Sequence, residues 1–245
     1  MISPTRAIRA SGFTLVEMMV SMAVASVVLL TAAYLLGGMG DSYDRVGGSV
    51  AAEREARAAI SQLRLDMESA IHHPDAPFSD AGGGVAFLSL QPAAAQSDVG
   101  RIGDVCAVHY RLADIRIGNR EQRVLMRGFR QSEETFGALG GGSTASLFEP
   151  RDQLDEPIAF GVIAFRATPV VRNQGGGWQA WTAASSNAPD AVEVRLVLAR
   201  RETLGRLRTA ADWDAEAARA DSAENDQNLE VFETRIRFGH EAGSR

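Results

Sequence analysis

One acidic side chain interrupts a long apolar stretch near the start of the sequence. Between Phe13 and Leu36 the only charged residue is Glu17, and its neighbours are Met, Val, Leu, Ala, Tyr and a few Ser and Thr. A charged side chain at the centre of a bilayer costs on the order of 2.5–3.5 kcal/mol by insertion scales, and less near an interface. An acid kept in such a segment is a functional hypothesis by default. Glu17 is therefore the first candidate site residue.

The other residues that could do chemistry form no recognised constellation. No histidine accompanies a nucleophile motif such as Gly-x-Ser-x-Gly, and no Cys/His zinc spacing occurs. Adjacent histidines on a helix point about 100° apart and converge poorly on a metal. The glycine triplets at 140–142 and 175–177 do not precede the Lys-Ser/Thr of a phosphate loop, and the polar stretch 221–228 lacks the spacing of a calcium loop. We therefore predict no catalytic residue, no metal site and no cofactor. The histidines are His72, His73, His109 and His240.

Composition limits the remaining function classes. The chain has 245 residues, enough for one globular domain beside the N-terminal segment, and a net charge of −6, which gives no reason to expect nucleic-acid binding. Its one cysteine, Cys106, excludes an internal disulfide and is predicted to be a small buried side chain.

The apolar stretch is long enough to be a membrane helix, which needs about 20 residues. Arg6 and Arg9 precede it without an acid, whereas Asp41 and Asp44 follow it. This charge pattern predicts a cytoplasmic N-terminus and a translocated C-terminal part. A cleavable secretory signal ending at Ala23-Val24-Ala25 is the competing interpretation. An acid inside the apolar region and the continuation of that region beyond residue 26 oppose it.

The sequence Gly12-Phe13-Thr14-Leu15-Val16-Glu17, after a short basic leader and before an apolar helix, resembles the class III signal of type IV pilins and type II secretion pseudopilins. The resemblance implies that prepilin peptidase cleaves between Gly12 and Phe13, that the new Phe13 amine is N-methylated, and that Glu17 pairs with the terminal amine of a neighbouring subunit. That pairing would fix axial register in a fibre. The alternative is that Glu17 only reaches the interface from an ordinary membrane anchor.

The chain is predicted to have four parts: a cleaved leader at 1–12, a transmembrane and assembly helix at 13–40, an amphipathic helix at 41–73, and a β-rich periplasmic domain at 74–245. Glycines between 37 and 48 should weaken or break the helix, giving either a soft joint or a plain helix end. An apolar stripe of Ile60, Leu63, Met67 and Ile71 is expected to pack on the following sheet. Pro74 should close this second helix after His72.

Strand patterns dominate after Pro74. We expect strands at 85–90, 157–168, 178–182 and 229–238, a hairpin formed by 105–117 and 122–129, a half-exposed strand at 192–198, a long loop at 131–153 and a short helix at 212–219. The fold class is therefore α+β, a long N-terminal helix packed on an antiparallel β-sheet, which is also the pilin-like shape that the resemblance implies.

The C-terminal pattern narrows the resemblance. Trp178 and Trp181 followed by Pro189-Asp190-Ala191-Val192-Glu193-Val194-Arg195-Leu196 are similar to J-type minor pseudopilins. A PilW-type minor pilin is the alternative, because the insert 201–228 is longer than the J-type pattern.

The function implied is a structural subunit of a pseudopilus for type II secretion, with other minor and major pseudopilins or pilins, prepilin peptidase and the inner membrane as partners, and no direct contact with nucleic acid. The alternatives are a minor pilin that primes a type IV pilus and a membrane-anchored periplasmic binding module.

Overall fold

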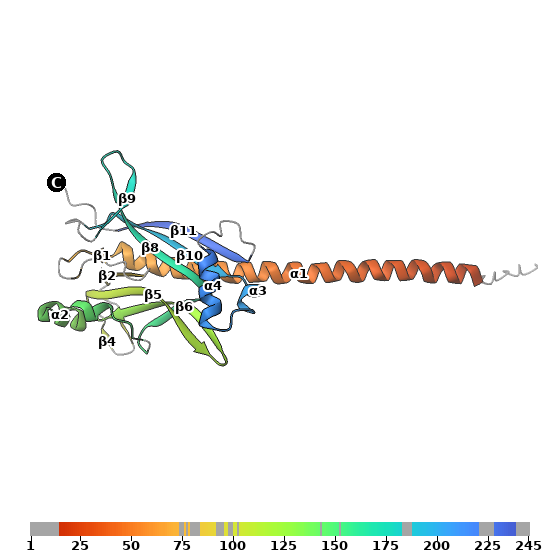
Figure 1. Ribbon diagram of the computed structural model, residues 1–245, viewed down its shortest axis with the longest axis horizontal. Coiled ribbons are helices and arrows are strands. Elements are labelled where there is room, and N and C mark those ends of the chain that lie inside the picture. The colour runs from red at the N-terminus through yellow and green to blue at the C-terminus, as the bar shows by residue number, and fades with distance from the viewer. Residues whose placement is uncertain are drawn as a thin grey trace, which may run out of the picture. The chain divides into compact units, whose positions relative to one another are not determined.

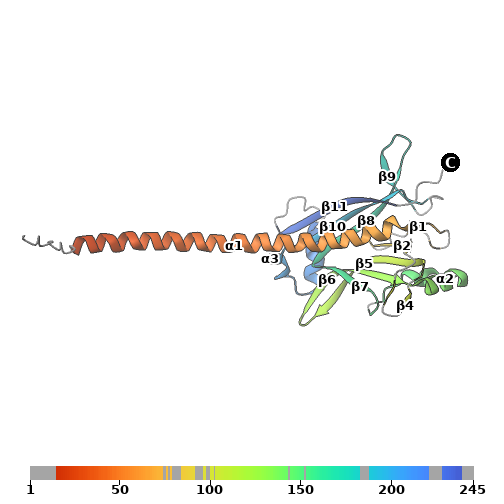
Figure 2. The ribbon, with the colours of Figure 1, turned by 180° about the vertical axis from the view of Figure 1, so that it is seen from behind.

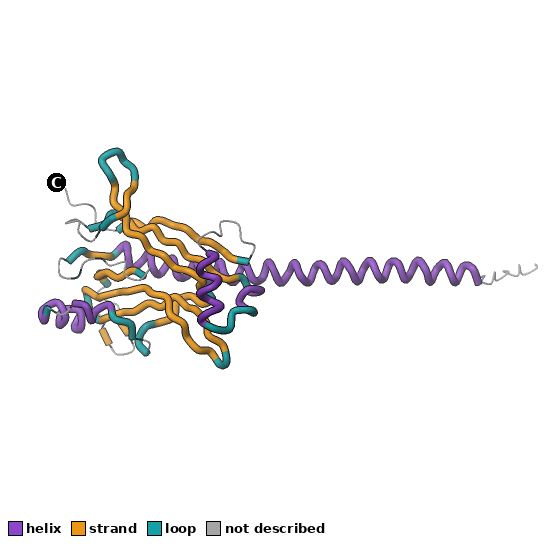
Figure 3. Tube along the Cα trace, in the orientation of Figure 1, coloured by secondary structure: helices purple, strands orange, loops and turns teal. Residues whose placement is uncertain are grey.

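The computed structural model describes residues 15–73, 76, 78, 84–91, 96–97, 100–101, 103–142, 144–151, 153–182, 188–220 and 228–238 (Figure 3). The chain divides into two compact units, Met1–Val46 and Gly47–Arg245. A long N-terminal helix is followed by antiparallel strands, so the predicted α+β class is confirmed.

Helix α1 extends from Leu15 to Glu68 and belongs to both units (Figure 1). The helix end expected among the glycines of residues 37–48 is wrong, because helical backbone continues through them. Each glycine costs about 1 kcal/mol relative to alanine, but extending an existing helix adds one hydrogen bond for each residue fixed. The boundary between the two units falls in this segment, between Val46 and Gly47. A soft joint there stays a prediction.

The C-terminal end of α1 also differs from the prediction. The helix ends at Glu68 and not near His72, and Ala70–Ile71 form strand β1, which pairs with Val85–Leu90, strand β2. The backbone N–H of Leu90 donates to the carbonyl of Ser69 at 2.8 Å. The backbone of residues 69–71 therefore forms hydrogen bonds with strand β2 and does not continue the helix toward Pro74.

Five strands form the first sheet, in the order β1-β2-β5-β6-β7. Strands β5 (Val105–Ile117) and β6 (Arg120–Arg130) are the predicted hairpin, and Gly118 adopts φ 63° in its turn. Strand β7 is Glu156–Phe160. A separate two-stranded ribbon consists of β3 (Gln96–Ser97) and β4 (Gly100–Arg101).

Four strands form the second sheet, in the order β11-β10-β8-β9. They are β8 (Val162–Arg172), β9 (Trp178–Ala180), β10 (Ala191–Ala199) and β11 (Leu229–Arg237). The single strand predicted over 157–168 is wrong, because Gly161 at φ 72° turns the chain from β7 in one sheet into β8 in the other. Only glycine adopts this backbone region without strain.

The main core lies between α1 and both sheets. Seen from the side of Figure 2, the Gly47–Glu68 part of α1 lies in front of the region where the two sheets meet. The predicted stripe is confirmed for Leu63 and Met67, which are buried, and Ile60 packs at its margin. Three alanines extend the stripe, Ala52, Ala56 and Ala59. Small side chains on this face let the helix backbone approach the strands closely.

Residues 131–153, predicted as a loop, contain two short helices, α2 (Ser132–Gly141) and the 3₁₀ helix η2 (Thr144–Phe148). The glycines of 140–142 suggested a loop, but tertiary contacts hold the helix. The Thr135 hydroxyl accepts from the backbone N–H of Ala107 in β5 at 3.1 Å, and Leu147 is buried against the first sheet with Ala107 and Leu88.

The insert 201–228 carries α3 (Arg201–Leu204) and α4 (Ala210–Ala220), and the predicted helix at 212–219 is thereby confirmed. Trp213 of α4 is buried against Ile163 and Val197 on the outer face of the second sheet. Because α4 covers this end, β10 is more buried than the half-exposed strand we predicted. The Trp213 indole N–H donates to the carbonyl of Glu121 in β6 at 3.0 Å, so the insert links the second sheet to the hairpin of the first.

Candidate assembly site

The first part of α1 presents an apolar surface. Every side chain from Leu15 to Tyr34 is exposed within the structure, with Leu15 at 77% and Tyr34 at 83%. This stretch is long and apolar enough to cross a membrane. Apolar surface of this extent marks contact with a membrane or with another protein, so the segment is a candidate for both.

Glu17 lies in the first turn of the described helix, on the same exposed surface as Val16 and Met18. An acid in the first turn is favoured by the backbone N–H groups and the helix dipole. The other predicted site residues, Arg6, Arg9, Gly12 and Phe13, lie outside the described residues, and their roles stay predictions.

A buried ion pair attaches the second part of α1 to the first sheet. Both Asp66 carboxylate oxygens accept from Arg127 of β6: Nε donates to Oδ2 at 2.7 Å and Nη2 to Oδ1 at 2.9 Å. The Tyr110 hydroxyl of β5 donates to Oδ2, and Ser89 of β2 donates to the Asp66 carbonyl at 2.9 Å. The Asp66 and Arg127 side chains are only 4% and 13% exposed.

The electrostatics of this site follow from burial and pairing. Burial raises the pKa of the Tyr110 hydroxyl well above its ordinary value, and the Asp66 charge adds to this effect. Burial lowers the pKa of Arg127, but hydrogen bonds and charge from Asp66 outweigh it, and the net direction is upward. Asp66 therefore anchors the helix through its ion pair with the Arg127 guanidinium. Asp66 is not among the site residues identified from the sequence. The one signal for it in the sequence is that this acid directly precedes Met67 of the apolar stripe.

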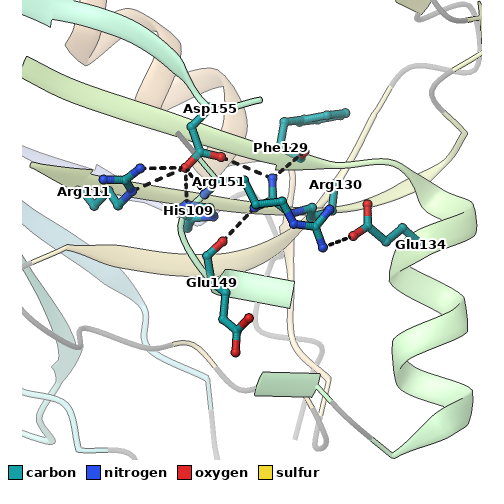
Figure 4. Close-up of polar contacts among 8 residues, drawn as sticks. All are labelled: His109, Arg111, Phe129, Arg130, Glu134, Glu149, Arg151 and Asp155. Carbon is teal, nitrogen blue, oxygen red and sulfur yellow. Dashed lines mark hydrogen bonds and ion pairs between the residues drawn. The ribbon is translucent and has the colours of Figure 1, made fainter. Parts of the chain in front are cut away.

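A second buried carboxylate, Asp155, gathers side chains from the outer side of the first sheet (Figure 4). Its Oδ2 accepts from Arg111 Nη2 at 3.1 Å, from His109 Nε2 at 3.3 Å and from the Arg151 backbone N–H at 3.0 Å, and Oδ1 accepts from Arg130 Nη1 at 3.3 Å. Arg130 also donates from Nη2 to the Glu149 carbonyl at 2.7 Å. The cluster joins β5 and β6 to the segment before β7.

His109 and Asp155 are the residue types of a catalytic His–Asp pair, but their surroundings do not suit acid–base catalysis. Burial lowers the pKa of His109, and the hydrogen bonds that Asp155 accepts keep the pKa of Asp155 low against the effect of its burial. The His109 Nδ1 has no hydrogen-bond partner among the described residues, so a second ring proton would find no acceptor. The buried thiol of Cys106 has its pKa raised to about 11 by burial and would not be a thiolate nucleophile. The arrangement is suited to holding the sheet together.

Metal binding has no support within the described part of the chain, where no group of three or more His, Cys, Asp or Glu could hold an ion. The polar stretch with a calcium-loop composition falls mostly at 221–227, outside the described residues.

Comparison with known proteins bears on the N-terminal segment. A family model described as the prokaryotic N-terminal methylation motif matches residues 8–33, which include Gly12, Phe13 and Glu17. A comparison with curated proteins found no match. The motif supports a type IV pilin-like class III signal in this segment and indicates likeness to pilins and pseudopilins, in which such a signal implies processing by prepilin peptidase. Together with the apolar helix it suggests membrane anchoring.

Proposed function

We propose that this chain is a minor pseudopilin, a structural subunit that initiates or caps the short periplasmic fibre of a type II secretion system. The observation that carries the proposal is the methylation motif over residues 8–33, leading into an exposed apolar helix with an acid in its first turn.

The proposed role of Glu17 follows from charge compensation. Cleavage between Gly12 and Phe13 would leave an α-amine at Phe13 that is largely protonated near neutral pH. An isolated charge is strongly disfavoured where the surroundings are apolar, so the amine of one subunit and the Glu17 carboxylate of its neighbour would stabilise each other. Such a pair can form at only one axial offset between helices, and it therefore sets the register of the fibre.

The globular unit supports this role through its attachment to α1. A subunit that is drawn out of the membrane by its helix must transmit force to its folded domain. The Asp66–Arg127 pair and the packing of Leu63 and Met67 would carry that load between α1 and the two sheets.

A minor pilin that primes a type IV pilus is the second candidate. The insert 201–228 favours it, because α3 and α4 elaborate the domain beyond the J-type pattern. Testing a deletion strain for protein secretion and for surface pili separates the two: loss of secretion alone supports the pseudopilin, and loss of pili alone supports the pilin.

Glu17→Val tests the assembly role. The variant should still insert and be cleaved, but it should be absent from isolated fibres, because an apolar residue cannot pair with the amine. Ser26→Ala is the matched control on the same exposed helix, since the Ser26 hydroxyl donates locally to the carbonyl of Met22, one turn earlier. Normal fibre incorporation of Glu17→Val would eliminate the register role, and absence of the parent chain itself from fibres would favour a simple anchor that carries a binding module.

A further inference from the structure

The turn of the β5–β6 hairpin lies at the end of the globular unit where α1 enters it. Arg127 of β6 binds Asp66 of α1. Earlier in α1, Glu55 accepts from the backbone N–H of Phe160 at 3.4 Å, and Phe160 pairs with Val124 of β6. Going back along α1 from Asp66 to Glu55 therefore leads along β6 toward the hairpin turn (Figure 2). The turn lies at the same end as the first residues of α1 in this unit.

Exposed arginines gather at this end of the unit. Arg116 and Arg120 flank the hairpin turn, and Arg206 lies between α3 and α4. The backbone N–H of Glu121 donates to the carbonyl of Arg208 at 3.1 Å, which places the segment between α3 and α4 beside the hairpin. Within the described part of the chain, the side chains of Arg116, Arg120 and Arg206 form no hydrogen bond or ion pair. Their guanidinium groups are therefore available to a ligand.

Most carboxylates near these arginines have partners inside the unit. The carboxylates with partners are Asp114, Glu121, Asp212 and Asp214. Arg123 donates to Asp114 at 2.8 Å and to Asp214 at 2.7 Å. Glu121 and Asp212 accept from backbone N–H groups at or just before the start of α4, at 2.6 Å and 3.0 Å. Glu202 of α3 is the exposed exception, and the three arginines outnumber it.

An apolar side chain lies between two of the arginines. Ile117, at the hairpin turn, is 50% exposed. We call Arg116, Ile117, Arg120 and Arg206 the basic end. Guanidinium groups bind phosphate oxygens in paired hydrogen bonds, and binding to a membrane surface grows with buried apolar area and with attraction to anionic lipids. The basic end has both properties.

The candidate membrane span Leu15–Tyr34 is joined to this end of the unit by a short linker. Only residues 35–46 separate the span from the unit that begins at Gly47. At the helical rise of 1.5 Å per residue, these twelve residues span about 18 Å. A chain inserted in a membrane therefore keeps its globular unit close to the lipid headgroups.

We propose that the basic end docks the globular unit on anionic phospholipid headgroups while the chain is anchored in the membrane. Lipid phosphates would bind the three arginines, and Ile117 would enter the boundary between headgroups and acyl chains. Such docking would hold the unit at the membrane surface until the chain leaves the bilayer. The inference rests on the membrane anchoring that the proposed function includes, and it is independent of Glu17 and of the fibre.

The experiment places an NBD fluorophore at Asn119→Cys, in the exposed turn, on the full chain reconstituted in lipid nanodiscs. Cys106 is buried and should not be labelled. In discs that contain phosphatidylglycerol, the NBD emission should shift to the blue and be quenched by brominated acyl chains. Both effects should be weaker in phosphatidylcholine discs and should decrease as ionic strength rises. The same label at Glu133→Cys, exposed on α2 near the other end of β5, should show neither effect.

Charge neutralisation tests the arginines. Arg116→Gln/Arg120→Gln should lower the equilibrium constant for docking about twentyfold, because each arginine near an anionic surface contributes roughly fivefold. The matched control, Arg64→Gln/Arg237→Gln, makes the same change of charge at two exposed arginines elsewhere on the unit and should leave the NBD signal unchanged. Circular dichroism establishes that both double variants are folded.

Three results would overturn the proposal. The first is a chain present in the discs without a lipid signal at residue 119, and the second is an equal loss of signal in both double variants. The third is a signal that rises with the number of chains per disc and not with phosphatidylglycerol, which would assign the basic end to contacts between subunits. A chain that does not enter the discs would refute the membrane anchoring itself, and this inference with it.

Discussion

Replacing Asp66 by asparagine should destabilise the globular unit by about 3 kcal/mol, the lower end of the roughly 3–5 kcal/mol range for removing one partner of a buried ion pair. The lower end is expected because the asparagine side chain keeps the volume of Asp66 and can still accept from the Tyr110 hydroxyl. The cost arises because Arg127 would remain charged with a side chain only 13% exposed and no carboxylate beside it. Truncation of both partners, Asp66→Asn with Arg127→Met, should cost less than the sum of the single changes.

Urea unfolding of the full chain in detergent micelles, followed by tryptophan fluorescence, is the appropriate assay. All three tryptophans, Trp178, Trp181 and Trp213, belong to the unit Gly47–Arg245, so the signal does not report the apolar segment 15–34. Glu68→Gln is the matched control: it removes an exposed carboxylate from the same turn of α1 and should change the free energy of unfolding by no more than about 0.5 kcal/mol. If Asp66→Asn is as stable as Glu68→Gln, the reasoning that this pair anchors α1 is refuted.

Three further predictions concern the globular unit. In Gly128→Ala the new Cβ would lie 1.8 Å from Cε1 of His109, and this overpacking should lower the free energy of unfolding in urea by about 1–3 kcal/mol. Truncating the ring as well, in His109→Ala/Gly128→Ala, should relieve the clash. If Gly128→Ala alone is as stable as the parent chain, the packing described is contradicted. Trp213→Ala should cost about 3–5 kcal/mol, read by circular dichroism, because the side chain is 1% exposed; a loss below about 1 kcal/mol would mean that the insert does not stabilise the sheets. The third prediction is a pH dependence. Burial lowers the pKa of His109 below its ordinary 6.5, so the unfolded chain binds the extra proton first, and the free energy of unfolding should fall as pH drops below about 6.5 until the folded-state pKa is reached. His109→Gln should flatten that decline, and a decline of unchanged slope would exclude His109 as its source.

Local patterns predicted those elements whose stabilising contacts are close in sequence. The β5–β6 hairpin has its turn at Gly118 and its partners in adjacent segments, and α4 shows helical periodicity of its own. The N-terminal signal is equally local, which explains why six consecutive residues from Gly12 to Glu17 were sufficient to suggest it and why a motif model over residues 8–33 agrees.

Features held by distant contacts were missed. Asp66 appears as one more polar residue on a helix until the fold brings Arg127 to it from 61 positions away. Helix α2 has glycines that argue against a helix, and Thr135 reaches across 28 positions to hold it. The division into two sheets depends on one left-handed backbone at Gly161, a conformation that the pattern around it does not reveal.

The central claim is that the chain is a processed pilin-like subunit, and the N-terminus of the mature protein tests it most directly. Intact-mass and peptide mass spectrometry of the chain purified from membranes should find N-methylated Phe13 as the first residue. Ser26 as the first residue would identify a secretory signal cleaved after Ala25, and an uncleaved Met1 would identify an ordinary anchor. Either result would contradict the account.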